Sequence, residues 1–119
     1  MERLCLNHCN IHDRGMSIIS QSLLRTQLRY CNLAWCKLTS ASLNDLSLFI
    51  RGNNKLEKLL LQHNHLSDAN QNKHFFNALC ENISLRYLDL SANNMSDTTK
   101  AALEAWKASN APNCHISGI

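Results

Sequence analysis

The chain repeats one pattern of apolar residues four times, and this repetition limits the possible fold more than any other feature. In each copy, an apolar residue or Cys stands at the first, fourth, sixth and eleventh positions, and Asn or Cys stands at the ninth. The copies begin near residues 1, 28, 56 and 85, so that the units are 27–29 residues long. Such a period predicts a stack of similar units, each covering the apolar face of its neighbour, rather than a closed globule.

Each unit is predicted to contain one strand followed by one helix. Four pairs of residues alternate with outward-facing positions at the period of two that a strand requires, namely Leu4/Leu6, Cys31/Leu33, Leu59/Leu61 and Leu88/Leu90. After each strand, apolar residues three or four apart form one face of a helix. Residues that favour helix N-caps and turns precede these helices, at Asp13, Ser40, Asp68 and Asp97.

A unit of this length with a full helix resembles the ribonuclease-inhibitor class of leucine-rich repeat, and residues 56–68 and 85–97 carry the resemblance most clearly. Residues 102–116, which include Trp106, resemble the closing segment of the repeat domains in NACHT-type nucleotide-binding, leucine-rich-repeat receptors. In those receptors a tryptophan helix and a final short strand cover the last repeat. The chain has no phosphate-binding glycine loop, so it could supply only the repeat function of such a receptor.

The resemblance implies an α/β solenoid, a short horseshoe segment with parallel strands on its concave face and helices on its convex face. Residues 1–111 are expected to form about four repeats, and residues 112–119 the closing segment. No polar capping element precedes the first repeat, although a terminal repeat normally needs one. We therefore expect further repeats or a homodimer contact at the N-terminal edge.

Composition and charge exclude several classes of function. The net charge of +3 is small and spread along the chain, which argues against nucleic acid as a partner. Neither an apolar run near 20 residues nor a secretory signal is present, so no membrane association and a cytoplasmic location are expected. The six cysteines are expected to be reduced. Cys9 and Cys36 are predicted to be buried in turns and Cys5 to be exposed, whereas Cys80 and Cys114 are not assigned.

The candidate site is the set of strand residues that project from the concave face, where stacking places equivalent positions in columns. Tyr, Trp and Arg dominate binding hot spots, and Trp35 is the first candidate. Trp35 could instead only pack on His8 and His63 and stiffen the turns. The predicted partner-binding residues are Arg3, Tyr30, Trp35, Lys58, Leu60, His63, Arg86, Tyr87 and Asp89. This face is mildly basic, which favours a neutral or acidic protein partner.

No catalytic, cofactor or metal site is predicted. His8 and His63 lie two repeats apart, about 10 Å at the usual strand spacing, which is too far to share one zinc ion. No nucleophile with a base and an oxyanion site nearby is visible.

The favoured function is therefore a non-catalytic protein–protein interaction module, forming the ligand-sensing or autoinhibitory repeats of an intracellular receptor of innate-immune type. Two alternatives stay open. One is a regulator of a GTPase or an enzyme, because Ran GTPase-activating proteins share this repeat class. The other is a truncated repeat fragment that is unstable alone.

Overall fold

The computed structural model describes residues 2–67, 73–110 and 114–119. Five strands of three residues each form one parallel sheet in the order β1-β2-β3-β4-β5. The strands are β1 (Arg3–Cys5), β2 (Tyr30–Asn32), β3 (Lys58–Leu60), β4 (Tyr87–Asp89) and β5 (His115–Ser117). The helices are α1 (His12–Ser22), α2 (Leu43–Gly52), α3 (Lys73–Glu81) and α4 (Asp97–Asn110), and a short 3₁₀ helix, η1 (Ser40–Ser42), precedes α2.

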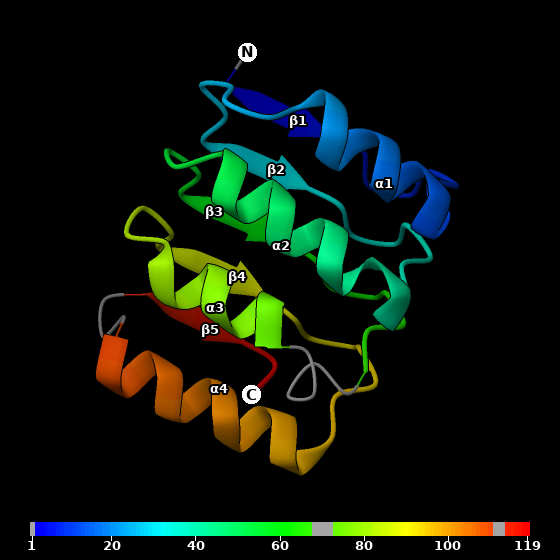
Figure 1. The fold of residues 1–119 in the computed structure, drawn as a ribbon. Coiled ribbons are helices and arrows are strands. Elements are labelled where there is room, and N and C mark those ends of the chain that lie inside the picture. The colour runs from blue at the N-terminus through cyan, green and yellow to red at the C-terminus, as the bar shows by residue number, and fades with distance from the viewer. Residues whose placement is uncertain (1, 68–72, 111–113) are drawn as a thin grey trace.

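Strands and helices alternate along the chain and separate into two layers. The sheet forms one side of the stack and the four helices form the other (Figure 1). Neighbouring strands pair without any shift between units, so that Arg3, Tyr30, Lys58, Tyr87 and His115 lie side by side across the sheet. The predicted α/β solenoid of stacked strand–helix units is confirmed.

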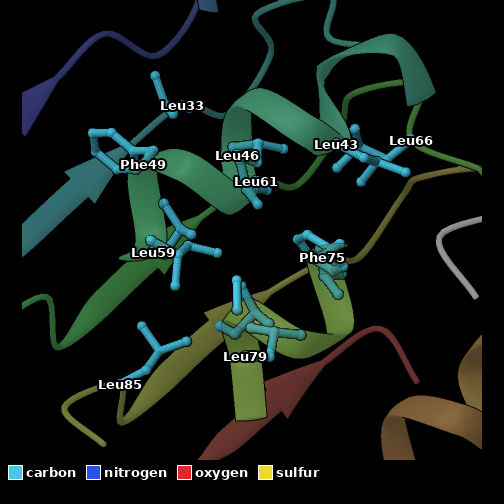
Figure 2. Packing of buried hydrophobic residues seen from close by; sticks show 14 of the residues in the cluster. Leu33, Leu43, Leu46, Phe49, Leu59, Leu61, Leu66, Phe75, Leu79 and Leu85 are labelled. Atoms are coloured by element: carbon cyan, nitrogen blue, oxygen red, sulfur yellow. The ribbon is translucent and has the colours of Figure 1, made fainter. Parts of the chain in front are cut away.

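The core lies between the two layers and contains the repeated apolar residues. Leu33, Leu59 and Leu61 have no exposed surface, and Phe49 and Phe75 from the helices are equally buried. Figure 2 shows these side chains meeting between the strands and helices. Burying a side chain of this size contributes about 1.5–3 kcal/mol, so the leucine-lined interior is the main source of stability in this fold.

The turn after each strand is stabilised by the ninth residue of the pattern. Asn93 donates from Nδ2 to the carbonyls of Leu61 and Leu90, and its Oδ1 accepts from the amide of Leu66. Cys36 makes a simpler contact, because its thiol donates to the carbonyl of Leu6 in the preceding unit. The side chain at this position therefore joins neighbouring units through backbone groups that would otherwise be buried without partners.

The structure places two helix caps one residue earlier than predicted. Thr39, rather than Ser40, caps η1, since its hydroxyl accepts from the amide of Ala41. Ser96, rather than Asp97, caps α4, since its hydroxyl accepts from the amide of Thr99. Asp13 also does not cap its own helix, because Ile11 occupies the N-cap. Asp68 lies outside the described residues.

The C-terminal strand β5 pairs with β4 and adds a fifth strand beyond the fourth helix. Gly118 follows with a positive φ of 95°, and a Cβ atom there would lie 2.5 Å from the backbone nitrogen of Ser91. Only glycine fits this close approach of two backbones. The predicted boundary between repeats and closing segment, at residues 111 and 112, lies outside the described residues, so the division stays a prediction.

Within the described parts of the chain, no helix is both long enough and apolar enough to cross a membrane.

Candidate functional site

The first residues of the five strands form a continuous row on the concave face, which we call the concave ladder. Its members are Arg3, Tyr30, Lys58, Tyr87 and His115, paired in register from β1 to β5. Arg3, Lys58 and His115 are exposed, and the two tyrosines are half-buried. Cationic and aromatic side chains therefore alternate along the row, with His115 at its end.

The side chains of the ladder contact one another directly. The guanidinium carbon of Arg3 lies 4.1 Å from the centre of the Tyr30 ring, and Lys58 Nζ lies 4.9 Å from the Tyr87 ring and 5.8 Å from the Tyr30 ring. The Tyr87 and His115 rings stack with centres 5.0 Å apart. Each cation–aromatic contact contributes about 0.5–1 kcal/mol at an exposed site. These contacts hold the charged ends in place before any partner arrives.

Leu60, in the next row of strand residues, is less exposed than predicted. Leu60 was expected to face solvent, but it is flanked in register by Asn32 on β2 and Asp89 on β4, and only 8% of its surface is exposed. Asp89, in the same row, is half-buried, and its Oδ1 accepts from the amide and the hydroxyl of Ser91. The position of Leu60 on the strand face was correct, but its exposure was not.

A second aromatic row, the turn stack, lies where the strands lead into the helices. Trp35 stacks between His8 and His63, with ring centres 5.3 Å and 4.0 Å away and planes within 15°. All three residues have positive φ values, between 57° and 62°. Because the same left-handed turn recurs in successive units, it brings the three side chains into line.

Trp35 is both packed and accessible. His8 and His63 come from the units on either side and cover the two faces of the indole ring, as one of the two interpretations of the sequence expected. Even so, 49% of the Trp35 surface is exposed. An aromatic side chain that is held firmly and still presents its edge to solvent is typical of a binding hot spot.

The acidic groups around the ladder are already engaged. Arg29 Nη1 lies 3.0 Å from Glu57 Oε2, and its Nε lies 3.9 Å from Glu2 Oε1. Arg86, also predicted to belong to the site, is exposed beside the ladder. Among the described residues, Arg3, Lys58 and Arg86 form no ion pair. The concave face therefore presents positive charge.

The six cysteines are unpaired, with Cys5, Cys9 and Cys80 exposed and Cys31, Cys36 and Cys114 buried. Exposure of Cys5 and burial of Cys36 agree with the prediction. Burial of Cys9 was wrong, because the first unit has no preceding unit in the structure to cover its turn. Burial raises the pKa of Cys31 to about 12, and it also raises the pKa of Cys36 and of Cys114. The three buried thiols are therefore unreactive at neutral pH.

The His, Cys, Asp and Glu residues do not cluster into a potential metal site in the ranges that the structure describes.

His115 was not among the residues predicted for the site. Its strand falls outside the four copies of the repeat pattern, although residues 102–116, which resemble a closing segment with a final short strand, include it. The Cys114-His115-Ile116 alternation, with Cys114 and Ile116 buried on either side of exposed His115, is the signal that could have placed His115 in the exposed row.

Comparison with known proteins agrees with the repeat and with the fold. A family model described as "Leucine Rich repeat" matches residues 81–98. A solved structure titled "Leiomodin-1 Actin-Binding Site 2 (ABS2)" superposes with a TM-score of 0.81 at 18% identity, over 99% of this chain and 69% of that chain. No curated protein matches the chain. At this level of identity the structural likeness establishes the fold, and function must be argued from the surface residues.

Proposed function

We propose that this leucine-rich-repeat protein is a non-catalytic binding module that captures a partner protein on its concave face. The observation that carries the proposal is Trp35, which is fixed between two histidine rings and remains half exposed. A side chain that is already ordered loses little conformational freedom on binding, so more of its contact energy appears as affinity. The concave ladder, whose Tyr30 lies five residues before Trp35 on the same repeat, runs across all five strands.

The charge of the face supports a neutral or acidic partner. Arg3, Lys58 and Arg86 are exposed, while the nearby carboxylates of Glu57 and Asp89 are engaged within the chain. A partner with complementary charge would be drawn to this face and held in one orientation.

We further propose that the module forms the ligand-sensing or autoinhibitory repeats of a cytoplasmic receptor of innate-immune type. Repeats of 27–29 residues and the tryptophan-bearing terminal helix support this assignment. In such a receptor the concave face would hold either a ligand or another domain of the same protein.

Substitution of Trp35 tests the binding face. The immobilised protein should capture partners from cytosol, and the purified partner should then bind directly. Trp35→Ala should weaken that binding by about 2 kcal/mol, or roughly 30-fold, as hot-spot truncations do. Leu48→Ala is the matched control, because Leu48 has a similar exposure of 42% but lies on α2, on the opposite side of the stack.

The direct assay should include actin, because the structural neighbour is an actin-binding site. Circular dichroism must show that both variants melt as the parent protein does. Equal affinity of the folded Trp35→Ala and Leu48→Ala variants for the purified partner would refute the proposed face.

A further inference from the structure

We infer, on the basis of the proposed function, that the concave ladder binds an acidic amphipathic α-helix of the partner protein, laid across the strands. In this arrangement, acidic side chains seven residues apart contact Arg3 and Lys58, an apolar side chain between them contacts Tyr30, and a second apolar side chain beyond the second acidic residue contacts Tyr87.

The charge pattern of the ladder favours acidic side chains on the partner. Arg3 and Lys58 extend from the first and third strands, and no carboxylate pairs with either of them among the described residues. Their charged ends are held over the tyrosine rings at 4.1 Å and 4.9 Å. Because the cations are already ordered, an incoming carboxylate gains a charge-assisted contact without the usual entropy loss of fixing a long side chain.

The distance between the strands that carry Arg3 and Lys58 favours a helical partner segment over an extended one. Arg3 and Lys58 are separated by two strand spacings, since Tyr30 on β2 lies between them in register. Two spacings amount to about 10 Å. Residues seven apart on an α-helix lie on the same face and are separated by about 10.5 Å. An extended peptide offers about 6.7 Å or 13.4 Å between residues on one face, and neither value matches.

The two tyrosine rings favour a partner helix that carries apolar residues on the same face as its acidic residues. Arg3 and Lys58 lie over the Tyr30 ring, and Lys58 and His115 lie against the Tyr87 ring, whose hydroxyl also lies 3.1 Å from Ser117 Oγ on β5. A residue three or four positions after the first acid would lie over Tyr30, halfway between the two carboxylates. The same spacing then repeats at Tyr87.

The extent of the ladder sets the length of the bound segment. Five strands span about 19 Å, which corresponds to a helix of about 13 residues. The predicted partner segment therefore contains acidic residues in heptad spacing, with apolar residues in between, over roughly four turns.

Two alanine-rich peptides of about 18 residues, long enough to be helical in water, provide the probe. Both have the same composition of Ala, Glu and Leu. In the registered peptide, Glu recurs every seven residues with Leu at the intervening positions, whereas in the shifted peptide the Glu residues are moved to different helix faces. Fluorescence anisotropy should show the registered peptide binding at least about fivefold tighter, with affinity falling as NaCl is added.

Charge reversal tests the assigned contact. Lys58→Glu should weaken the registered peptide about tenfold, and a peptide in which the central Glu is replaced by Lys should recover binding to that variant. Lys73→Glu, an exposed lysine at the start of α3, makes the same charge change away from the ladder and should leave affinity unchanged. Thermal melting of both variants establishes that they are folded.

Three outcomes would overturn the inference: equal affinity for the two peptides, equal effects of Lys58→Glu and Lys73→Glu, or tighter binding of poly-uridylate than of the registered peptide. The proposed function is tested separately. If Trp35→Ala abolishes partner capture and Lys58→Glu does not affect it, the binding face stands and the acidic helix is excluded. If neither substitution affects capture, both proposals fail.

Discussion

At the scale of single residues, Asn64 shows how one side chain joins two repeats. Its Nδ2 donates to the carbonyls of Leu33 and Leu61, and its Oδ1 accepts from the amides of Cys36 and Leu38, all at 2.9–3.0 Å. The side chain is 97% buried, so water cannot replace these contacts. The repeat pattern predicted an amide at this turn, but it could not identify the four backbone groups, because three of them belong to the preceding unit.

Removing this amide should be costly. Asn64→Ala removes the hydrogen-bond partner of two backbone amides and two backbone carbonyls in a buried turn. We expect the free energy of unfolding to fall by about 3 kcal/mol or more. Urea unfolding followed by circular dichroism measures the loss. Asn54→Ala, at an exposed position, is the control and should change stability by less than about 0.5 kcal/mol. Equal stability of the two variants would contradict the assigned role.

Cys31 should make the protein sensitive to alkaline pH. Burial raises the pKa of its thiol from 9.0 to about 12, so above pH 9 the unfolded chain loses a proton that the folded chain retains. The thiol's contribution is therefore complete below pH 9 and declines by about 1.4 kcal/mol per pH unit as the pH rises toward 12. Urea unfolding in a phosphine reductant at about pH 8 and about pH 10.5 should show a smaller decline for Cys31→Ala than for the parent protein.

At the scale of secondary-structure elements, the strands could be predicted from sequence more sharply than the helix starts. Strand positions follow from a steric requirement, since only apolar side chains fit between the layers. The helix starts fall in runs of residues that can all act as caps, such as Thr39-Ser40 and Ser96-Asp97. Local preference does not choose between neighbours in such a run. The choice depends on the path of the backbone, and η1 was not predicted at all.

Exposure was the other property that local sequence could not provide. Leu60 and Cys9 occupy regular positions of the repeat, yet Leu60 is buried and Cys9 is exposed. Both differences arise from adjacent units, because strands of both neighbouring units flank Leu60 and no preceding unit in the structure covers Cys9. The same limit applies to the concave ladder. Its column could be derived from the repeat, but the contacts between Arg3, Tyr30 and Lys58 could not.

Asp13 connects two helices and should make stability depend on acid pH. Its carboxylate accepts from the amide and hydroxyl of Thr39 and from the hydroxyl of Ser42, so it anchors η1 to the first turn of α1. Burial opposes its ionisation, but the hydrogen bonds from Ser42 and Thr39 outweigh burial and lower the pKa of Asp13 below 3.8. This contribution to stability is present above that pH and is lost as the pH falls through the lowered value.

Asp13→Ala should therefore reduce the free energy of unfolding by about 1 kcal/mol at neutral pH. The difference from the parent protein should shrink below about pH 4, as the carboxyl is protonated first in the unfolded chain and, at lower pH, in the folded chain. Thermal melts across this range measure the difference. A gap between the two proteins that stays constant as the pH falls would show that the carboxylate is not the stabilising group.

At the scale of the whole molecule, burial is uneven along the stack. Leu59 in the third unit has no exposed surface, whereas Leu4, its equivalent in the first unit, is only half-buried. In the same unit Ile18 is 62% exposed on α1. In a stack where each unit contacts only its neighbours, stability is a sum of unit and interface terms. A unit with one covered face should therefore be the least stable part of the described structure.

The same substitution should then have different costs at equivalent positions. Leu59→Ala removes a side chain that is packed between units on both sides, and we expect it to cost about 3–4 kcal/mol. Leu4→Ala should cost about 1 kcal/mol, because solvent already reaches the side chain and little cavity remains. Urea unfolding of the two variants measures the costs, and amide hydrogen exchange should show α1 opening before β3 in the parent protein. Equal costs, together with uniform protection across β1 to β4, would mean that these four strands unfold as one cooperative block and that the first unit is held as firmly as the centre.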